Sequence, residues 1–345
     1  MACSELRTDV LSGRQSIIAI GRSLRQGAMR SDPILSAEFD PFAEGCESET
    51  PGEVWALRDP GTAANAPGWR MRVVPNRFPI AGATVGGQAG AADAVEDSEL
   101  FPGLPFGGCH EVVIECPDLR TRLRDLTVGE LADVLGAWRD RTAAVAAMQR
   151  YRSVAIFRNE GFSAGASLPH CHSQILATEH VPALLLERHR RVEDYRRRTG
   201  RCLVSDLLVA ERAAGRRLIC EADGVAVWCP FAARTAWHVR FLPLQAGVFG
   251  EASGELLTIL AESLQRLCGA LSQQIGERFP FNLTVVQPAL DDADAFPWFV
   301  ELTPRITCQA GWELLTDIDV IPVAPEACAE RLRKALSGDQ SWLVR

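Results

Sequence analysis

The stretch Asn159-Glu-Gly-Phe-Ser-Ala-Gly-Ala-Ser-Leu-Pro-His-Cys-His-Ser-Gln174 decides how this chain is interpreted. A turn of small residues leads directly into His170, His172 and Gln174, which alternate along the sequence. Alternate residues of a β-strand point to the same face, so two imidazoles and an amide would lie together beside a loop whose backbone amides can approach phosphate oxygens. Because neutral imidazole is nucleophilic near pH 7, the pattern predicts phosphoryl or nucleotidyl transfer through His172.

Runs with strand or helix periodicity occur twice in the same order. In the first half, two strand-like runs, a long amphipathic helix and two further strand-like runs cover 71–80, 111–116, 127–148, 153–157 and 172–177. The second half repeats this order at 225–231, 237–244, about 255–275, 281–287 and 298–302. Thr127 and Glu130 fit a capping box at the start of the first helix. The sequence therefore predicts an α+β fold with antiparallel sheets and packed helices, arising from an internal duplication.

This repeat divides the chain into three parts. Residues 1–186 form an N-terminal half that contains the His-x-His-x-Gln segment, and residues 218–345 form a C-terminal half without it. Between them, residues 187–217 are rich in arginine and glutamate, which is typical of a solvated helix or helix pair.

Composition narrows the class of protein. The net charge of −8 argues against a nucleic-acid partner, because binding to a phosphate backbone needs an excess of clustered cations. Lys334 is the only lysine, so catalysis by a Schiff-base or P-loop lysine is excluded and phosphate contacts fall to arginine, histidine and backbone amides. The absence of a long apolar run and of a regular cysteine framework predicts a cytoplasmic protein with reduced thiols and no membrane partner.

Further motifs follow in a fixed order along the chain. They are Arg22-x-x-Arg25, Val-Val-Pro-Asn76-Arg-Phe-Pro, Gly108-Cys-His110-Glu-Val-Val-Ile, Glu301-Leu-Thr-Pro-Arg305 and Ala310-Gly-Trp-Glu313. Together with Asn-x-Gly, Gly-Ala-Ser and His-x-His-x-Gln, this order resembles the galactose-1-phosphate uridylyltransferase family of the histidine-triad superfamily. The resemblance covers nearly the whole chain and implies two histidine-triad-like halves, of which the second is degenerate.

The resemblance also implies roles for individual residues. His172 would be the nucleophile that becomes nucleotidylated, with His170 beside it and with Gln174 and Ser167 contacting the transferred phosphate. The nucleotide-binding set would comprise Asn76, Asn159, Gly165, Ser167, Gln174, Gly311 and Glu313. Arg22 and Arg25 would bind the phosphate or sugar phosphate of the second substrate. Members of the family are commonly homodimers, so 311–313 would act in the neighbouring chain's site.

A departure from the family pattern concerns zinc. The family's Cys-Pro-x-Cys pair aligns with Asp40-Pro-Phe-Ala43, so both thiolates are missing. The resemblance places His110 and His170 at the two remaining ligand positions, and Asp40 or Cys46 would have to complete a weaker zinc site. The proposed chemistry itself requires no cofactor.

The resemblance favours transfer of a nucleoside monophosphate, with UMP as the family's commonest group, from a nucleotide sugar to a phosphorylated acceptor. A phosphorylase that uses inorganic phosphate, a nucleotide hydrolase and a non-catalytic nucleotide-binding protein remain alternatives. The pattern Gly161-Phe-Ser163-Ala-Gly165 also matches the serine hydrolase motif Gly-x-Ser-x-Gly. That motif must lead into a helix, whereas Pro169 and the alternating residues after it predict a strand.

Overall fold

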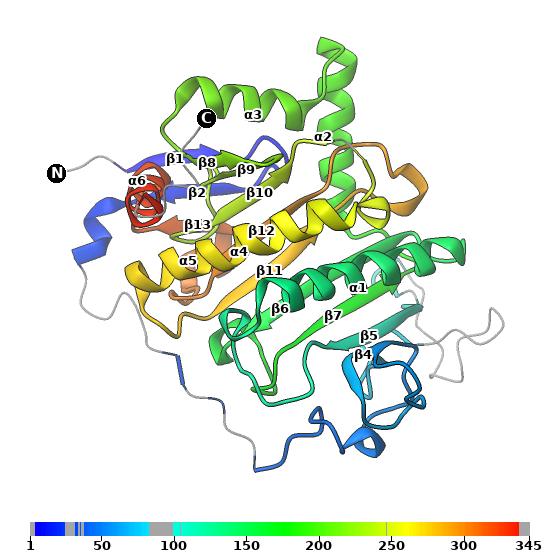
Figure 1. The fold of residues 1–345 in the computed structure, drawn as a ribbon. Coiled ribbons are helices and arrows are strands. Elements are labelled where there is room, and N and C mark those ends of the chain that lie inside the picture. The colour runs from blue at the N-terminus through cyan, green and yellow to red at the C-terminus, as the bar shows by residue number, and fades with distance from the viewer. Residues whose placement is uncertain are drawn as a thin grey trace.

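The computed structural model describes residues 4–24, 32–33, 35, 38–82, 99–103, 105–245 and 247–337. Within them, the chain forms a large antiparallel sheet with helices on its faces and a small sheet near the chain ends (Figure 1). The strands are β1 (Glu5–Thr8), β2 (Gln15–Ile18), β3 (Trp55–Arg58), β4 (Trp69–Pro75), β5 (Gly108–Ile114), β6 (Ser153–Glu160), β7 (His172–Thr178), β8 (Leu218–Ala222), β9 (Val225–Trp228), β10 (Val239–Pro243), β11 (Phe281–Val286), β12 (Phe299–Pro304) and β13 (Ile318–Ile321). The helices are α1 (Val128–Ala147), α2 (Ala183–Thr199), α3 (Leu203–Ala214), α4 (Gly254–Ile275), α5 (Gly311–Thr316) and α6 (Pro325–Leu336).

The large sheet repeats one topology. Its strand order is β3-β4-β5-β7-β6-β11-β12-β10-β9-β8, so each half contributes five strands in the same relative order. Helix α1 connects β5 to β6, and α4 connects β10 to β11 at the equivalent place. The antiparallel pair β6 and β11 joins the two halves into one continuous sheet. The predicted α+β class with antiparallel sheets is confirmed, whereas the division at 186 and 218 stays an interpretation of this repeat.

The two long helices begin where local sequence directs them. Thr127 caps α1, since its side chain accepts a hydrogen bond from the Glu130 backbone N–H at 3.2 Å and the Glu130 carboxylate accepts from the Thr127 N–H at 2.7 Å. Ser253 caps α4 in the same way through the Leu256 N–H. Both helices contact each other and cover the same face of the sheet (Figure 1). Their apolar stripes, which include Trp138 and Leu260, form one core cluster that extends across both halves.

Two features of the fold differ from the sequence expectations. The predicted strand at 71–80 ends at Pro75, and 76–80 form a turn instead. The small sheet contains a parallel pair, β2 with β13, beside the antiparallel pair β1 with β2. It therefore ties the beginning of the chain to its C-terminal end. Helices α2 and α3 form a pair between β7 and β8, in the segment where a helix or helix pair was predicted.

Two further properties of the described residues concern membrane-spanning helices and disulfides. None of the helices there is long and apolar enough to cross a membrane. The cysteines in the same part of the chain are all free thiols.

Candidate active site

The loop between β6 and β7 places His172 at the start of β7. Gly161 follows β6 with a φ of +88°, and Gly165 ends a short 3-10 turn at Phe162–Ala164 with a φ of +91°. Both torsions lie in the region that glycine adopts without steric cost. A Cβ on Gly161 would also lie 2.4 Å from Asp32 Oδ2. The two glycines therefore allow the chain to reverse tightly and enter β7 at His172.

His172 is held in one tautomer. Its Nδ1 lies 2.7 Å from the His170 carbonyl oxygen, which can only accept, so Nδ1 carries the proton and donates. Burial lowers the pKa of His172 to about 4, so the imidazole is neutral at physiological pH. Its side chain is only 6% exposed and packs edge-on against Phe42, with ring centroids 5.4 Å apart. Nε2 therefore carries the nucleophilic lone pair.

Two cavities meet at His172. The larger one, of about 570 Å³, is lined by Phe42, Thr50, Asn76, Phe78, Ser167 and Gln174 as well as His172. Three predicted residues, Asn76, Ser167 and Gln174, thus lie with His172 in one cavity. Its aromatic and proline walls suit the flat faces of a base, and its polar side chains lie near the imidazole.

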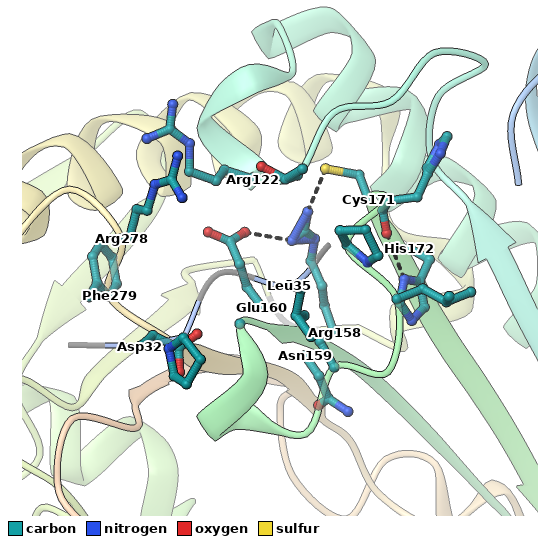
Figure 2. A pocket seen from close by; sticks show the side chains of 17 residues that line it. Asp32, Leu35, Arg122, Arg158, Asn159, Glu160, Cys171, His172, Arg278 and Phe279 are labelled. Atoms are coloured by element: carbon teal, nitrogen blue, oxygen red, sulfur yellow. Dashed lines mark hydrogen bonds and ion pairs between the residues drawn. The ribbon is translucent and has the colours of Figure 1, made fainter. Parts of the chain in front are cut away.

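The smaller cavity, of about 150 Å³, also borders His172 (Figure 2). Asn159, Glu160, Arg122 and Arg278 line it together with Arg158. Arg158 donates to Glu160 at 2.8 Å, yet burial raises the pKa of Glu160 to about 7. The cavity thus combines three guanidinium groups with a carboxyl group that titrates near neutrality.

Most amides of the glycine loop are occupied by the protein itself. The Asp32 carboxylate accepts from the N–H groups of Phe162 and Ser163, both at 2.8 Å. The next three amides, at 164–166, donate to carbonyl groups of the same loop. The expectation that this turn offers its amides to phosphate is therefore wrong for 162–166. Ser167 and Leu168, which follow these residues, line the larger cavity.

The predicted metal set is not assembled. His170 Nδ1 lies 2.7 Å from Asp40 Oδ2, and His170 Nε2 lies 2.9 Å from the Cys116 carbonyl oxygen. Each nitrogen of the ring therefore already has a protein partner. His110 lies elsewhere on β5, where its Nε2 is 2.8 Å from Gln174 Oε1. Among the described residues, no group of three or more His, Cys, Asp or Glu side chains is placed to hold a metal ion. The residues present do not fit zinc, because both ring nitrogens of His110 contact other groups instead, the Ile80 N–H and the Gln174 amide oxygen.

Other predicted residues lie away from His172. Arg22 is exposed on a 3-10 turn at Ile20–Leu24 and lines neither cavity, and Arg25 lies outside the described residues. Gly311 and Glu313 belong to α5 and also line neither cavity. Gly165 lines neither one but adjoins Asn159, whose Nδ2 is 3.8 Å from where a Cβ on this glycine would lie.

The serine hydrolase alternative lacks its required geometry. Ser163 is exposed in the three-residue 3-10 turn, and the chain continues from it into β7. A nucleophile elbow requires a helix at that position. His172 is therefore the better nucleophile on geometric grounds.

The second half has no counterpart of this histidine. Phe299 begins β12 at the place where His172 begins β7, and its ring is buried under the Arg240 guanidinium at 4.6 Å. Glu301, two residues later, accepts from Arg240 at 2.6 Å. The equivalent position is thus filled by packed aromatic and ion-pair contacts.

Sequence reasoning missed three residues near the site. Arg122 and Arg278 reach the smaller cavity from outside the motifs, and only the tertiary fold brings them there. Asn282 of β11 donates to Asn159 Oδ1 at 2.8 Å across the junction of the two halves. No spacing in the sequence signals this pair, since the two asparagines are 123 positions apart.

Comparisons with known proteins agree with this geometry. The family profile "Galactose-1-phosphate uridyl transferase, N-terminal domain" matches residues 76–182. The ADP-glucose phosphorylase of Arabidopsis thaliana is 26% identical over 339 residues, covering 96% of this chain and 92% of that protein. A galactose-1-phosphate uridylyltransferase of Thermotoga maritima is 25% identical over 237 residues, covering 66% and 74%. A crystal structure of the Arabidopsis thaliana ADP-glucose phosphorylase with bound ADP-glucose superposes with a TM-score of 0.78 at 26% identity, covering 96% of this chain and 99% of that one.

The protein is thus an enzyme of the nucleotidyltransferase type with a histidine-triad-like α+β fold. Its similarity to the galactose-1-phosphate uridylyltransferase family is most direct at residues 76–182, which match the profile of that family's N-terminal domain.

Proposed function

We propose that this enzyme moves a nucleoside monophosphate from a nucleotide sugar to a phosphorylated acceptor through a covalent nucleotidyl-His172 intermediate. The observation that carries the proposal is the fixed tautomer of His172. Its Nδ1–H donates to the His170 carbonyl at 2.7 Å, and this leaves the Nε2 lone pair for attack where the two cavities meet.

The reaction proceeds in two displacements. Nε2 attacks the α-phosphorus, an N–P bond forms, and the P–O bond to the sugar phosphate breaks with its electron pair on the leaving oxygen. An oxygen of the acceptor then attacks the same phosphorus, and the N–P electron pair returns to Nε2. In this proposal, Gln174, Ser167 and Asn159 donate hydrogen bonds to the non-bridging oxygens in both steps. This chain's own residues thus supply the nucleophile and the donors.

The larger cavity is the site proposed for the nucleoside. Phe42 and Phe78 supply apolar surface for a base, and Asn76 supplies a polar group. The near full-length similarity to an ADP-glucose phosphorylase supports adenosine as well as uridine, and it supports inorganic phosphate as an acceptor beside sugar phosphates. The three arginines of the smaller cavity suit the phosphate group of such an acceptor.

The test is an intact-mass measurement after incubation with ADP-glucose or UDP-glucose. A mass gain of one nucleoside monophosphate, lost in acid and absent from His172→Asn, is expected, and the added mass identifies the base. Addition of phosphate or a sugar phosphate then reveals the acceptor through the product released. A wild-type protein that turns over either nucleotide sugar without forming this adduct contradicts the mechanism. His180→Ala is the matched control, because His180 lines neither cavity.

We also propose that the enzyme is a homodimer and that α5 lies at the interface. This short helix exposes apolar side chains at its surface, with Trp312 48%, Leu314 75% and Leu315 83% exposed. Gly311 and Glu313 would then reach the partner's site. Replacing both Leu314 and Leu315 with serine is expected to yield a monomer in sedimentation analysis, and a dimer that persists contradicts the assignment.

A further inference from the structure

The orientation of the Gln174 amide is fixed by a backbone group. His110 Nδ1 lies 3.1 Å from the backbone N–H of Ile80, which can only donate, so Nδ1 is the acceptor nitrogen of the ring. An acceptor nitrogen carries no proton, so the single proton of the ring is on Nε2. That N–H donates to Gln174 Oε1 at 2.8 Å. Asn76 Nδ2 lies 3.3 Å from the same Nε2. Because both nitrogens are then donors, they form no hydrogen bond with each other.

The Asn159 amide is fixed in a parallel way. Asn282 Nδ2 lies 2.8 Å from the Ala164 carbonyl oxygen, which can only accept, so this side of the Asn282 amide is its NH₂ group. The same Nδ2 donates to Asn159 Oδ1, also at 2.8 Å. In both pairs, therefore, the amide oxygen is held by a neighbour and the amide NH₂ group is turned away from it.

These two amides flank His172. Gln174 is two residues beyond it on the same face of β7 and lines the larger cavity. In the antiparallel register of β6 and β7, Phe157 stands opposite Gln174, so continuing that register places Asn159 opposite His172. Asn159 lines the smaller cavity, and His172 lines both.

We infer that His110 and Asn282 are positioning residues that turn the NH₂ groups of Gln174 and Asn159 toward the phosphoryl group on His172. This inference rests on the proposed nucleotidyl transfer and adds to it two residues that touch no substrate. Its chemical basis is the asymmetry of an amide. When its NH₂ group faces the phosphoryl group, the side chain stabilises the negative non-bridging oxygens. A flipped amide would instead present a carbonyl oxygen, which repels them.

The first test is a double-mutant cycle on the rate of adduct formation in a single turnover, with ADP-glucose and UDP-glucose as probes. His110→Ala frees the Gln174 amide to rotate and is expected to slow adduct formation roughly tenfold, part of the 10²–10³-fold cost of deleting such a donor. In a Gln174→Ala background, the same change is expected to have no further effect, because nothing is left to orient.

The matched control is His189→Ala. His189 makes the same two kinds of bond, since its Nε2 accepts from the Ala289 N–H at 3.1 Å and its Nδ1 lies 3.1 Å from the Asp292 carboxylate. It lines neither cavity, so the rate is expected to stay at the wild-type value. Equal slowing by His110→Ala with and without Gln174 would overturn the positioning role and indicate a purely structural one.

The second test compares Asn282→Ala with Asn282→Asp. An aspartate only accepts, so it draws the Asn159 NH₂ group toward itself and leaves the amide oxygen facing the phosphoryl group. Asn282→Asp is therefore expected to be about tenfold slower than Asn282→Ala, and the two are expected to be equally fast once Asn159 is alanine. Equal rates of the two single variants would overturn the inference. A wild-type protein without any adduct overturns the proposed function itself, which separates the two failures.

Discussion

The pH dependence of the first displacement depends on how His172 is buried. A solvated histidine titrates near 6.5, whereas burial lowers the pKa of His172 to about 4. At pH 5.5, roughly 3% of such a ring is protonated, compared with roughly 90% of a solvated one. We therefore expect kcat/KM for the nucleotide sugar, which reports the free enzyme, to show no loss from His172 protonation between pH 7 and pH 5.5.

The assay is stopped-flow or quenched adduct formation at subsaturating donor over pH 4.5 to 8. UDP-glucose carries no group that titrates in this window, and a circular dichroism spectrum at each pH verifies that the enzyme stays folded. Because Glu160 in the smaller cavity titrates near pH 7, the profile is also measured with Glu160→Gln. A decrease in kcat/KM with an apparent pKa near 6.5 that persists in this variant would refute the argument, because it would mean that the His172 ring is solvated before donor binds.

The same shift predicts a stability effect. Between about pH 6.5 and pH 4 the unfolded chain binds a proton at His172 that the folded chain does not, so stability falls as the pH falls through this window. The limit is about 3 kcal/mol, from a shift of roughly 2.5 pH units. Urea unfolding of the wild type is expected to show about 2 kcal/mol of this loss between pH 7 and pH 5, and His172→Asn is expected to lack this contribution.

Three other substitutions test the surrounding structure. Asp40→Ala removes the acceptor that lies 2.7 Å from His170 Nδ1. This change is expected to lower the free energy of unfolding in urea by about 1.5–3 kcal/mol and to slow adduct formation. An unchanged rate would show that this contact does not orient the site. Gly161→Ala forces a Cβ onto a φ of +88° and within 2.4 Å of the Asp32 carboxylate, so a loss of about 1–3 kcal/mol is expected, and wild-type stability would contradict the loop geometry. Leu260→Ala, in the middle of α4 and fully buried, is expected to cost about 2–5 kcal/mol with little change in the pH profile, and a smaller loss would mean that the core repacks.

Local sequence determined much of the fold. The capping box of Thr127 and Glu130 and the periodicity after it specify α1, because both depend on residues within one or two helical turns. The alternation of His172 and Gln174 likewise predicts one strand face, and both side chains line the larger cavity. The repeated order of strands and helices was sufficient for the α+β class and the duplicated topology.

The contacts between site residues on different strands could not be predicted from the local sequence in the same way. His110 was expected beside His170 as a zinc ligand, but the register of β5 with β7 sets it opposite Leu176 and close to Gln174. Asn282 gave no signal, since its contact with Asn159 depends on the pairing of β6 with β11.

The sequence by itself determined which chemical groups the site contains. They are an imidazole in an extended segment, one amide two residues further along that segment, another amide on the neighbouring strand, and arginine as the cation for phosphate. Only the tertiary structure decided their states. The depressed pKa of His172, the tautomer of His110 and the Asp32 carboxylate on the loop amides arise from burial and from contacts between segments far apart in the chain. Protonation and amide orientation depend on the groups within a few ångströms, and the chain brings those groups together only when it folds.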